Sequence, residues 1–438
     1  MLIPRWFGPK QQGDPEVMVD WRNRYLQAVL KAAVVGFLYL LVTSCAVLLS
    51  PSMAQGRLFK NLSVEFLGST ELPADQRFED TVVGGLSGII YDRQQDQFYV
   101  LSDARGYESP PRFYTLQLDF DASDFQPQTT VDSELDALVT AVSNAIEPLS
   151  SPQLAIQAEI TAVTTLQDER GQPYPANQLD PEAIALSPQG TLYISSEGVR
   201  LSNAPPRLLE FDLSSGQWLQ DVPVPQQFKM AFDAASHRQD QGIQDNRGFE
   251  GLAIPPFGTV PAQGEPIRLF TMNESPLMQD FDPDVVEDGG RLRWLHYYIG
   301  DGEPLLIAEH VYTLDPVPLA LINGVTDLLA LDQAGHFLTL ERAFTPFGHQ
   351  AKLFQATLAG ATDVTTFPSL KGELKGITKA RKQELFNLKD AGLSAENFEG
   401  MTLGPRLPDG SQSLIVVSDN NFESDQATAV LVFRLQGL

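Results

Sequence analysis

The sequence predicts an all-β protein, a β-propeller that follows an N-terminal signal segment. Short runs of apolar and β-branched residues recur along the chain, with Gly, Pro, Asn and Asp between them, whereas helical periodicity is scarce. A two-part unit also recurs, with a polar or acidic residue in its first part and an acid at the end of its second. Repeated four-stranded units arranged around an axis form a propeller, so both observations favour this fold class.

The N-terminal part of the chain carries a targeting signal. Residues 32–49 are uncharged and almost wholly apolar, basic residues precede them, and Ser52-Met53-Ala54 follows. This order predicts a signal peptide cleaved after Ala54. We therefore expect an N-terminal extension and signal peptide over residues 1–54, a propeller domain over residues 55–438, and an exported protein, either periplasmic or secreted.

Two alternatives for this segment stay open. The apolar run is long for a signal peptide, so an uncleaved membrane anchor would also explain it. Val42-Thr43-Ser44-Cys45 resembles a bacterial lipobox, which would place a lipid on Cys45 and make the protein a lipoprotein. We expect contact with a membrane only through one of these two devices.

Composition excludes several classes of protein. Asp and Glu number 56 against 30 Lys and Arg, which gives a formal net charge of -26. A chain this acidic repels phosphate backbones, so nucleic acid is not an expected partner, whereas a cation is a suitable ligand. The single cysteine excludes a disulfide framework and a cysteine zinc finger.

The repeated unit consists of an apolar strand opened by a polar or acidic residue and a second strand that ends in an acid. The spacing within a unit suits an antiparallel hairpin, and the spacing between units leaves room for two outer strands. Taking the units as a lower bound, we expect six blades, with five or seven open and a pair of β-sandwiches as the alternative fold. The five units pair residues 86–90 with 100–103, 181–185 with 194–197, 249–253 with 271–274, 326–330 with 338–341, and 398–402 with 416–419.

Two segments fall outside this pattern. Residues 131–148 are the best helix candidate and are expected to leave the sheet framework. Residues 280–290 are expected to form an acidic surface loop.

The acids of the units should meet at one end of the propeller, because the start of one strand in an antiparallel hairpin lies beside the end of its partner. Crowded carboxylates repel each other unless cations or arginines compensate them. Alternatively, such acids serve only the structure, by accepting backbone N–H groups or by pairing with arginine between blades. The acids concerned are Glu182, Glu250, Asp327 and Glu399 at strand starts, and Asp103, Glu197, Glu274, Glu341 and Asp419 at strand ends.

Several phrases give the chain a family resemblance. They include LSGIIYD (86–92), DPEAIAL (180–186), NRGFEGLAI (246–254), NFEGMTLGP (397–405) and LIVVSDNNF (414–422). From about residue 60 to its end the chain resembles the phytase-like domain described as "esterase-like activity of phytase", which is common in exported bacterial proteins. The resemblance implies a propeller-like fold and a phosphoester or ester hydrolase activity. Two departures are Glu182-Ala183, where the family prefers Glu-Gly, and Asp327 in place of Glu.

The chemistry expected of these residues is that of a divalent cation. Carboxylate oxygens are hard ligands that suit Ca²⁺, with Mg²⁺ as the alternative, and a bound cation can hold a phosphate and activate water. Arginines bind phosphate oxygens bidentately. We therefore assign Glu182, Glu250 and Glu399 as catalytic, Arg105, Arg247 and Arg342 as substrate-binding, and Asp103, Glu197, Glu274, Asp327, Glu341, Asp419 and Asn420 as metal ligands.

Other hydrolytic machineries are missing from the sequence. There is no GxSxG nucleophile elbow, the histidines are scattered without HExxH spacing, and Cys45 lies in the signal segment. The expected function is an exported hydrolase that acts on a small-molecule phosphoester or ester with a divalent cation. The alternative is a non-catalytic propeller that binds a ligand or calcium at the cell surface or in the periplasm.

Overall fold

A computed structural model describes residues 58–107, 109–120, 155–257, 264–282, 289–393 and 396–438. The chain divides into two compact units, Met1–Leu58 and Phe59–Leu438, and the second contains the described fold. The expected signal segment and the helix expected over residues 131–148 lie outside the described residues, as does much of the acidic loop 280–290. Within the described ranges, no helix has the length and apolarity needed to cross a membrane.

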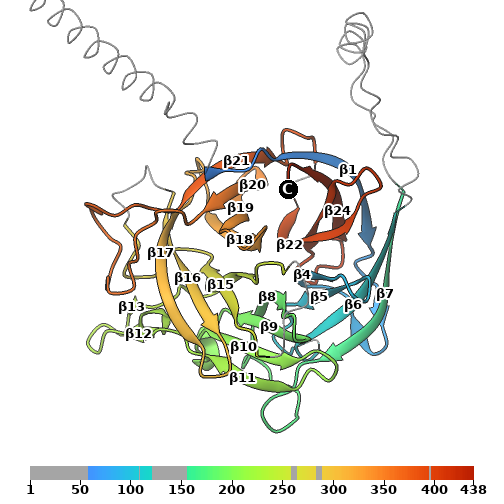
Figure 1. Ribbon diagram of the computed structural model, residues 1–438. Coiled ribbons are helices and arrows are strands. Elements are labelled where there is room, and N and C mark those ends of the chain that lie inside the picture. Colours follow the sequence, from blue (N-terminus) through green and yellow to red (C-terminus); the bar gives the residue numbers. More distant parts are fainter. Residues whose placement is uncertain (1–57, 108, 121–154, 258–263, 283–288, 394–395) are drawn as a thin grey trace, which may run out of the picture. The chain divides into compact units, whose positions relative to one another are not determined.

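The fold is a propeller of five four-stranded antiparallel sheets arranged around an axis (Figure 1). From the inside outward, the first blade contains β4 (Leu86–Asp92), β5 (Gln97–Ser102), β6 (Arg112–Phe120) and β7 (Ile156–Thr165), and the second contains β8 (Pro181–Leu186), β9 (Thr191–Ser196), β10 (Arg207–Asp212) and β11 (Trp218–Val222). The third contains β14 (Phe249–Ala253), β15 (Ile267–Asn273), β16 (Arg291–Ile299) and β17 (Leu305–Thr313). The fourth contains β18 (Ile322–Ala330), β19 (His336–Thr345), β20 (Gly348–Thr357) and β21 (Arg381–Asn387).

The fifth blade joins the two ends of the domain. It consists of β22 (Asn397–Arg406), β23 (Gln412–Asp419), β24 (Thr428–Gln436) and β1 (Ser63–Leu72). The N-terminal strand β1 runs antiparallel to the C-terminal strand β24, from the pair Ser63 and Gln436 to the pair Leu72 and Thr428. The ring is thus closed by hydrogen bonds between the beginning and the end of the domain.

Short elements complete the fold at the connections between strands. They are the hairpins of β2 (Arg77–Phe78) with β3 (Thr81–Val82) and of β12 (Ala231–Phe232) with β13 (Gln239–Gln241), and the 3₁₀ turns η2 (Arg200–Ser202) and η3 (Gln226–Phe228).

The five sequence units are the inner hairpins of the five blades, β4/β5, β8/β9, β14/β15, β18/β19 and β22/β23. The all-β propeller is therefore confirmed, and the β-sandwich alternative fails. The preferred number of six blades was too high, whereas five was left open. Every blade contains one unit. The long sequences between units form outer strands and connections, such as residues 358–380 between β20 and β21, and not a sixth blade.

The apolar core is divided among the interfaces between adjacent blades. Val100 belongs to the cluster between the fifth and first blades, and the next residue, Leu101, belongs to the cluster between the first and second. Three similar clusters lie at the other three interfaces. Successive side chains of a strand point to opposite faces of its sheet, so a blade covered on both faces needs an unbroken apolar strand.

Glycine after the first acid of a unit is explained by the close approach of neighbouring inner strands. A Cβ atom on Gly251 would lie 2.7 Å from Cβ of Leu328 in the next blade, and one on Gly400 would lie 3.0 Å from the carbonyl oxygen of Ser87. Both distances are too short for an ordinary carbon contact. In the Glu-Gly pair, the glutamate thus places a carboxylate near the axis, and the glycine, which has no Cβ, allows the inner strands of adjacent blades to pack closely.

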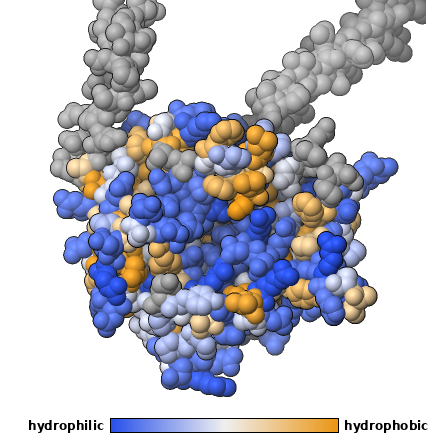
Figure 2. Space-filling model, turned by 180° about the vertical axis from the view of Figure 1, so that it is seen from behind, coloured by the Kyte–Doolittle hydropathy of each residue, from blue (hydrophilic) through white to orange (hydrophobic). Residues whose placement is uncertain are grey.

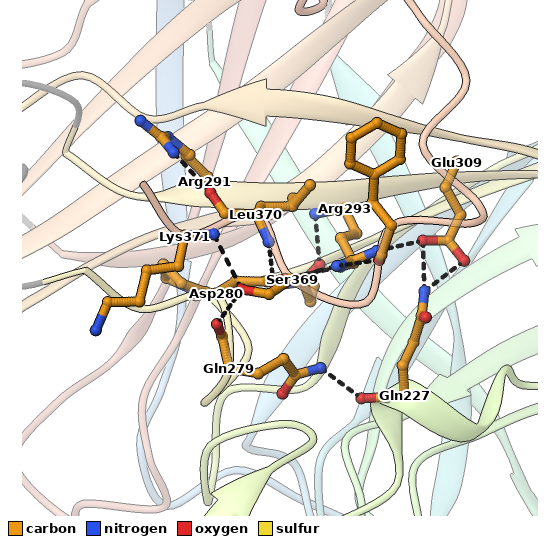
Figure 3. Close-up of polar contacts among 12 residues, drawn as sticks. Gln227, Gln279, Asp280, Arg291, Arg293, Glu309, Ser369, Leu370 and Lys371 are labelled. Atoms are coloured by element: carbon orange, nitrogen blue, oxygen red, sulfur yellow. Dashed lines mark hydrogen bonds and ion pairs between the residues drawn. The ribbon is translucent and has the colours of Figure 1, made fainter. Parts of the chain in front are cut away.

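A long connection ties the fourth blade to the third (Figure 3). Residues of the β20–β21 connection donate backbone hydrogen bonds to β17, from Val364 N to Glu309 O and from Ala380 N to Val311 O. Beneath it, the fully buried Arg293 forms ion pairs with Asp280 at 2.7 Å and with Glu309 at 2.9 Å. The charges of this buried network are paired with one another, so we assign the network a structural role in holding the third and fourth blades together.

Candidate functional site

Polar residues of the inner hairpins form two rings at one end of the propeller axis. The strand pairs next to the β-bulge of each inner hairpin join Leu86 to Ser102, Pro181 to Ser196, Phe249 to Asn273, Val325 to Glu341 and Phe398 to Ser418. The residue that follows each pair on the innermost strand lies at a β-bulge, and these residues are Ser87, Glu182, Glu250, Thr326 and Glu399. The residues that follow on the neighbouring strand are Asp103, Glu197, Glu274, Arg342 and Asp419.

The fourth blade departs from the expected alignment by one residue. Because Val325 pairs with Glu341, Arg342 occupies the ring position at which the other blades carry an acid, and Thr326 occupies the bulge. A shift of one residue moves a side chain to the other face of its strand. The two acids expected at these positions, Asp327 and Glu341, therefore point elsewhere.

Both displaced acids have structural partners. Asp327 accepts backbone hydrogen bonds from Leu328 N at 2.7 Å and from Met401 N at 2.6 Å, so it ties the fourth blade to the fifth. Glu341 accepts a hydrogen bond from the side-chain hydroxyl of Tyr312 at 2.6 Å and forms an ion pair with Lys382. Neither lines the axial cavity, in contrast to the expectation that all nine acids share one site.

The remaining acids include two groups with the spacing of a metal site. Ligand oxygens of Asp180, Glu182 and Glu197 lie within 4.8 Å of one another, and so do those of Glu197, Glu250 and Glu274. Glu197 is common to both groups and is held by a hydrogen bond from Gly248 N at 2.7 Å. All five side chains are buried.

Several ligand oxygens of these groups have no hydrogen-bond partner among the described residues. They are Oδ2 of Asp180, Oε2 of Glu197 and Oε2 of Glu250. A buried acceptor without a partner costs about 1–3 kcal/mol, and more if it is charged. The donor set of each group therefore fits a hard cation, which would satisfy such oxygens.

The electrostatics of the groups favour the uncharged form of the acids when nothing is bound. Burial, together with repulsion from neighbouring carboxylates, raises the pKa of Glu182, Glu197 and Glu250 well above the usual value. Burial also raises the pKa of Asp180 to about 6, although Arg105 opposes the shift. A divalent cation would reverse this preference because it binds the ionised carboxylates.

Arg342 supplies positive charge from within the ring. Its guanidinium pairs with Glu274 at 2.8 Å and with Glu399 on the other side. Burial alone would lower the pKa of Arg342, but Glu399, Glu274 and Glu250 raise it overall, so the side chain stays charged. Its Nε atom is buried and has no hydrogen-bond partner among the described residues.

Glu399 and Asp419 are coupled through Asn397. The Asn397 amide donates to Glu399 Oε1 at 2.9 Å and to Asp419 Oδ2 at 3.4 Å. Burial raises the pKa of Glu399 to about 8 against the pull of Arg342, and it raises that of Asp419 to about 6. The higher pKa of Glu399 and the lower pKa of Asp419 suit the roles of an acid and a base.

These groups open into a cavity of about 460 Å³. Its polar lining contains five of the acids, two of the three expected arginines and three asparagines: Asp103, Glu182, Glu250, Glu399 and Asp419; Arg105 and Arg342; Asn246, Asn397 and Asn421. Arg105 pairs with Asp180 at 2.6 Å and donates to Asn246. The third expected arginine, Arg247, lines an adjoining cavity of about 420 Å³ instead.

Asn420 has a different place from the one expected for a ligand. Its Oδ1 atom accepts hydrogen bonds from Gly85 N at 2.9 Å and from Phe422 N at 3.2 Å, so it shapes the turn after β23. Its amide nitrogen has no partner in the described part of the chain.

Sequence reasoning missed Asp180, Asn397 and His349. Asp180 and Asn397 both lie two residues before the first acid of a unit, so a comparison of that position across the units would have marked them. His349 lies at the start of β20, outside the repeated unit, and no spacing pattern indicated that it lines the cavity.

The two ends of the axis differ in chemistry. Opposite the acids, a cavity of about 320 Å³ is lined mainly by apolar residues of the inner strands, among them Ile90, Leu186, Ile254 and Leu329. On the face shown in Figure 2, hydrophilic side chains occupy the centre and apolar patches lie around it. Among the described residues, the groups of acids with metal-ligand spacing lie at the acidic end.

The fold and site define a β-propeller with buried carboxylates at one end of its axis, spaced as metal ligands are. The chain belongs to the Phytase-like family, described as "Esterase-like activity of phytase", whose sequence profile matches residues 81–422. The sequence matches no protein among those with curated descriptions.

Solved structures with a similar course of the chain are distant. The catalytic domain of the Coprinopsis cinerea GH62 α-L-arabinofuranosidase shares 10% identity, with 86% of this chain and 97% of that one covered and a TM-score of 0.37. The Penicillium chrysogenum α-L-arabinanase shares 11% identity, with coverages of 81% and 79% and a TM-score of 0.34. We draw no functional conclusion from these similarities.

Proposed function

We propose that this protein hydrolyses phosphoesters or carboxylic esters with a divalent cation held by Asp180, Glu182, Glu197, Glu250 and Glu274. The observation that carries the proposal is the set of buried carboxylate oxygens without partners in two groups that share Glu197. Membership of the phytase-like family supports a hydrolase.

Calcium is the first choice of cation. Calcium accepts six to eight oxygen ligands in flexible geometry, whereas magnesium requires a near-ideal octahedron and keeps several waters. A ring of carboxylates from separate blades suits the more tolerant ion. When bound, such a cation polarises a phosphoryl or carbonyl oxygen and makes a bound water more acidic.

The protein's own residues would bind the substrate and move its protons. Arg342 and Arg105 line the same cavity, and their positive charges would attract an anionic group of the substrate. Asp419 would accept a proton from the attacking water. Glu399 would donate its proton to the leaving oxygen, after which the pair exchanges one proton to return to its starting state.

Export remains part of the proposal and rests on the sequence alone. The apolar run over residues 32–49 supports a cleaved signal peptide, with an uncleaved anchor or a lipid on Cys45 as the alternatives. The substrate would then be a small molecule met outside the cytoplasm.

Turnover by the purified full-length protein tests the proposal. We expect hydrolysis of p-nitrophenyl phosphate or p-nitrophenyl acetate that appears with calcium and disappears with chelator. Glu197→Gln should abolish both the turnover and the rise in melting temperature caused by calcium. The matched control is Glu341→Gln, a buried acid outside the cavity, which should retain both.

Two results would contradict parts of the proposal. Calcium binding without turnover of either ester favours the alternative, a non-catalytic calcium-binding propeller. Equal melting temperatures with calcium and with chelator show that arginine and backbone groups already compensate the acids.

A further inference from the structure

We infer that the axial cavity also binds a flat, apolar ring in the non-reacting part of its substrate, so that aryl esters are preferred. This inference rests on the proposed function and names its substrate class. Besides carboxylates and arginines, four ring side chains line the cavity, and we call these four the wall. The wall consists of Tyr107, Phe344, His349 and Phe422.

The wall is assembled from three blades. Tyr107 follows β5 of the first blade, Phe344 and His349 lie on β19 and β20 of the fourth, and Phe422 follows β23 of the fifth. The rings of Phe344 and His349 have centroids 4.8 Å apart and planes inclined by 43°. Tyr107 is 63% exposed, so its ring is accessible at the mouth. Aromatic side chains of this kind bind flat rings by offset or edge-to-face contact.

The backbone at Phe422 is held in a conformation that bulky residues rarely adopt. Asn421 and Phe422 have φ angles of 49° and 55°, two consecutive left-handed residues without glycine. Asp419 Oδ1 fixes the turn by accepting from Asn421 N at 2.7 Å, and Asn420 Oδ1 accepts from Phe422 N at 3.2 Å. Strained residues persist where the surrounding structure enforces them, and they cluster at functional sites.

The ring of Phe422 also packs against the backbone of Gly85, where a side chain would not fit. A Cβ atom on Gly85 would lie 2.4 Å from Cε2 of Phe422, so a side chain there would displace the ring. On another side, the Arg112 guanidinium lies 5.9 Å from the ring centroid. Two independent features thus place this ring in the cavity wall: the strained turn at Asn421 and Phe422, and the absence of a side chain at Gly85.

The wall carries no charge of its own. Burial and the nearby Arg342 lower the pKa of His349, while Glu396 opposes the shift, so the imidazole is neutral at physiological pH. Its Nδ1 atom is buried without a hydrogen-bond partner in the described part of the chain. Uncharged ring side chains and charged side chains in one cavity suit a ligand with one anionic or ester group and one apolar ring.

Ligand binding to the calcium-loaded full-length protein tests this inference without turnover. Titration calorimetry should show that phenylphosphonate binds about tenfold more tightly than methylphosphonate, because only the first carries a ring. Phe422→Asn removes the ring but tolerates the left-handed backbone, and Tyr107→Ser alters an exposed position. Each variant should reduce the preference to about threefold or less.

The control variant is Phe347→Ser. Phe347 is 85% exposed in the β19–β20 turn and does not line the cavity, so the tenfold preference should persist. Equal binding of the two phosphonates, or a preference that survives both wall variants, overturns the inference.

A probe without an anionic group separates the inference from the proposed function. Benzyl alcohol, detected by saturation-transfer NMR, should bind with or without calcium and should lose its signal in Phe422→Asn. If neither phosphonate binds but benzyl alcohol does, the cation mechanism fails and the wall stands. If benzyl alcohol does not bind, or binds Phe422→Asn equally well, the wall inference fails.

Discussion

Raising the pH from 5 to 8.5 should destabilise the calcium-free protein. The pKa of Asp419 is raised by burial from 3.8 to about 6, and that of Glu399 from 4.5 to about 8. An acid with a raised pKa binds more protons in the folded state than in the unfolded state. Its contribution to stability is therefore present at low pH and is lost as the pH rises through the folded pKa.

The size of the effect follows from the shift. One pKa unit corresponds to about 1.4 kcal/mol, and the pKa of Asp419 lies about one unit above pH 5. Over this pH range Asp419 therefore accounts for a loss of about 1.4 kcal/mol of unfolding free energy, most of it by pH 7. With the usual unfolding entropy per residue, this is about 2 °C of melting temperature for a domain of this size. Glu399 contributes over the higher part of the range.

Calcium should reverse the trend, because its ligands must be deprotonated before they bind it. The assay is melting temperature from pH 5 to 8.5 in chelator and in millimolar calcium, with the difference between the two growing as the pH rises. Asp419→Asn should reduce the fall in chelator between pH 5 and 7, whereas Asp168→Asn, at an acid whose pKa is lowered, should leave the curve unchanged in this range. A calcium-free stability that stays level or increases over this range would refute the reasoning.

Three further predictions concern packing and processing. Arg342→Met should cost about 3–5 kcal/mol at pH 8, because it leaves buried carboxylates uncompensated, and less at pH 5; equal losses in denaturant titrations at both pH values would argue against a charge effect. Gly251→Ala should cost about 1–3 kcal/mol in the same titrations, whereas Gly302→Ala, which meets no atom within 4 Å, should cost little; similar losses would contradict the close-approach argument. N-terminal sequencing of the exported protein should begin at Gln55, and a lipidated Cys45 or an intact N-terminus would exclude cleavage after Ala54.

The fold was predictable because the signal was local and repeated. Each inner hairpin has its own apolar strands and polar ends, and five copies specify a ring without any knowledge of the contacts between them. The number of blades was harder, since nothing in the pattern showed whether the long intervening segments concealed a further unit. The structure shows that the visible units were complete.

The candidate site was predictable only in part. The acids of four blades were placed correctly because their ring positions follow strand ends that the sequence shows clearly. In the fourth blade, Glu341 and Arg342 are adjacent, and hydrogen-bond register alone determines which of them reaches the axis. Phe422 comes from a turn and His349 from the start of β20, both outside the repeated unit, so only the folded chain brings them to the same cavity.

Because β1 pairs with β24, the fifth blade can form only after both strands have been synthesised. The strand made first has its partner in the strand made last, so the fifth blade stays incomplete until almost the whole chain has been released. The intervening blades can associate earlier, but the cavity shared by the first and fifth blades cannot. Because such distant pairing is slow, unpaired edges stay exposed to other chains for longer. A C-terminal truncation that removes β24 should therefore yield an open, aggregation-prone ring rather than a slightly weakened one.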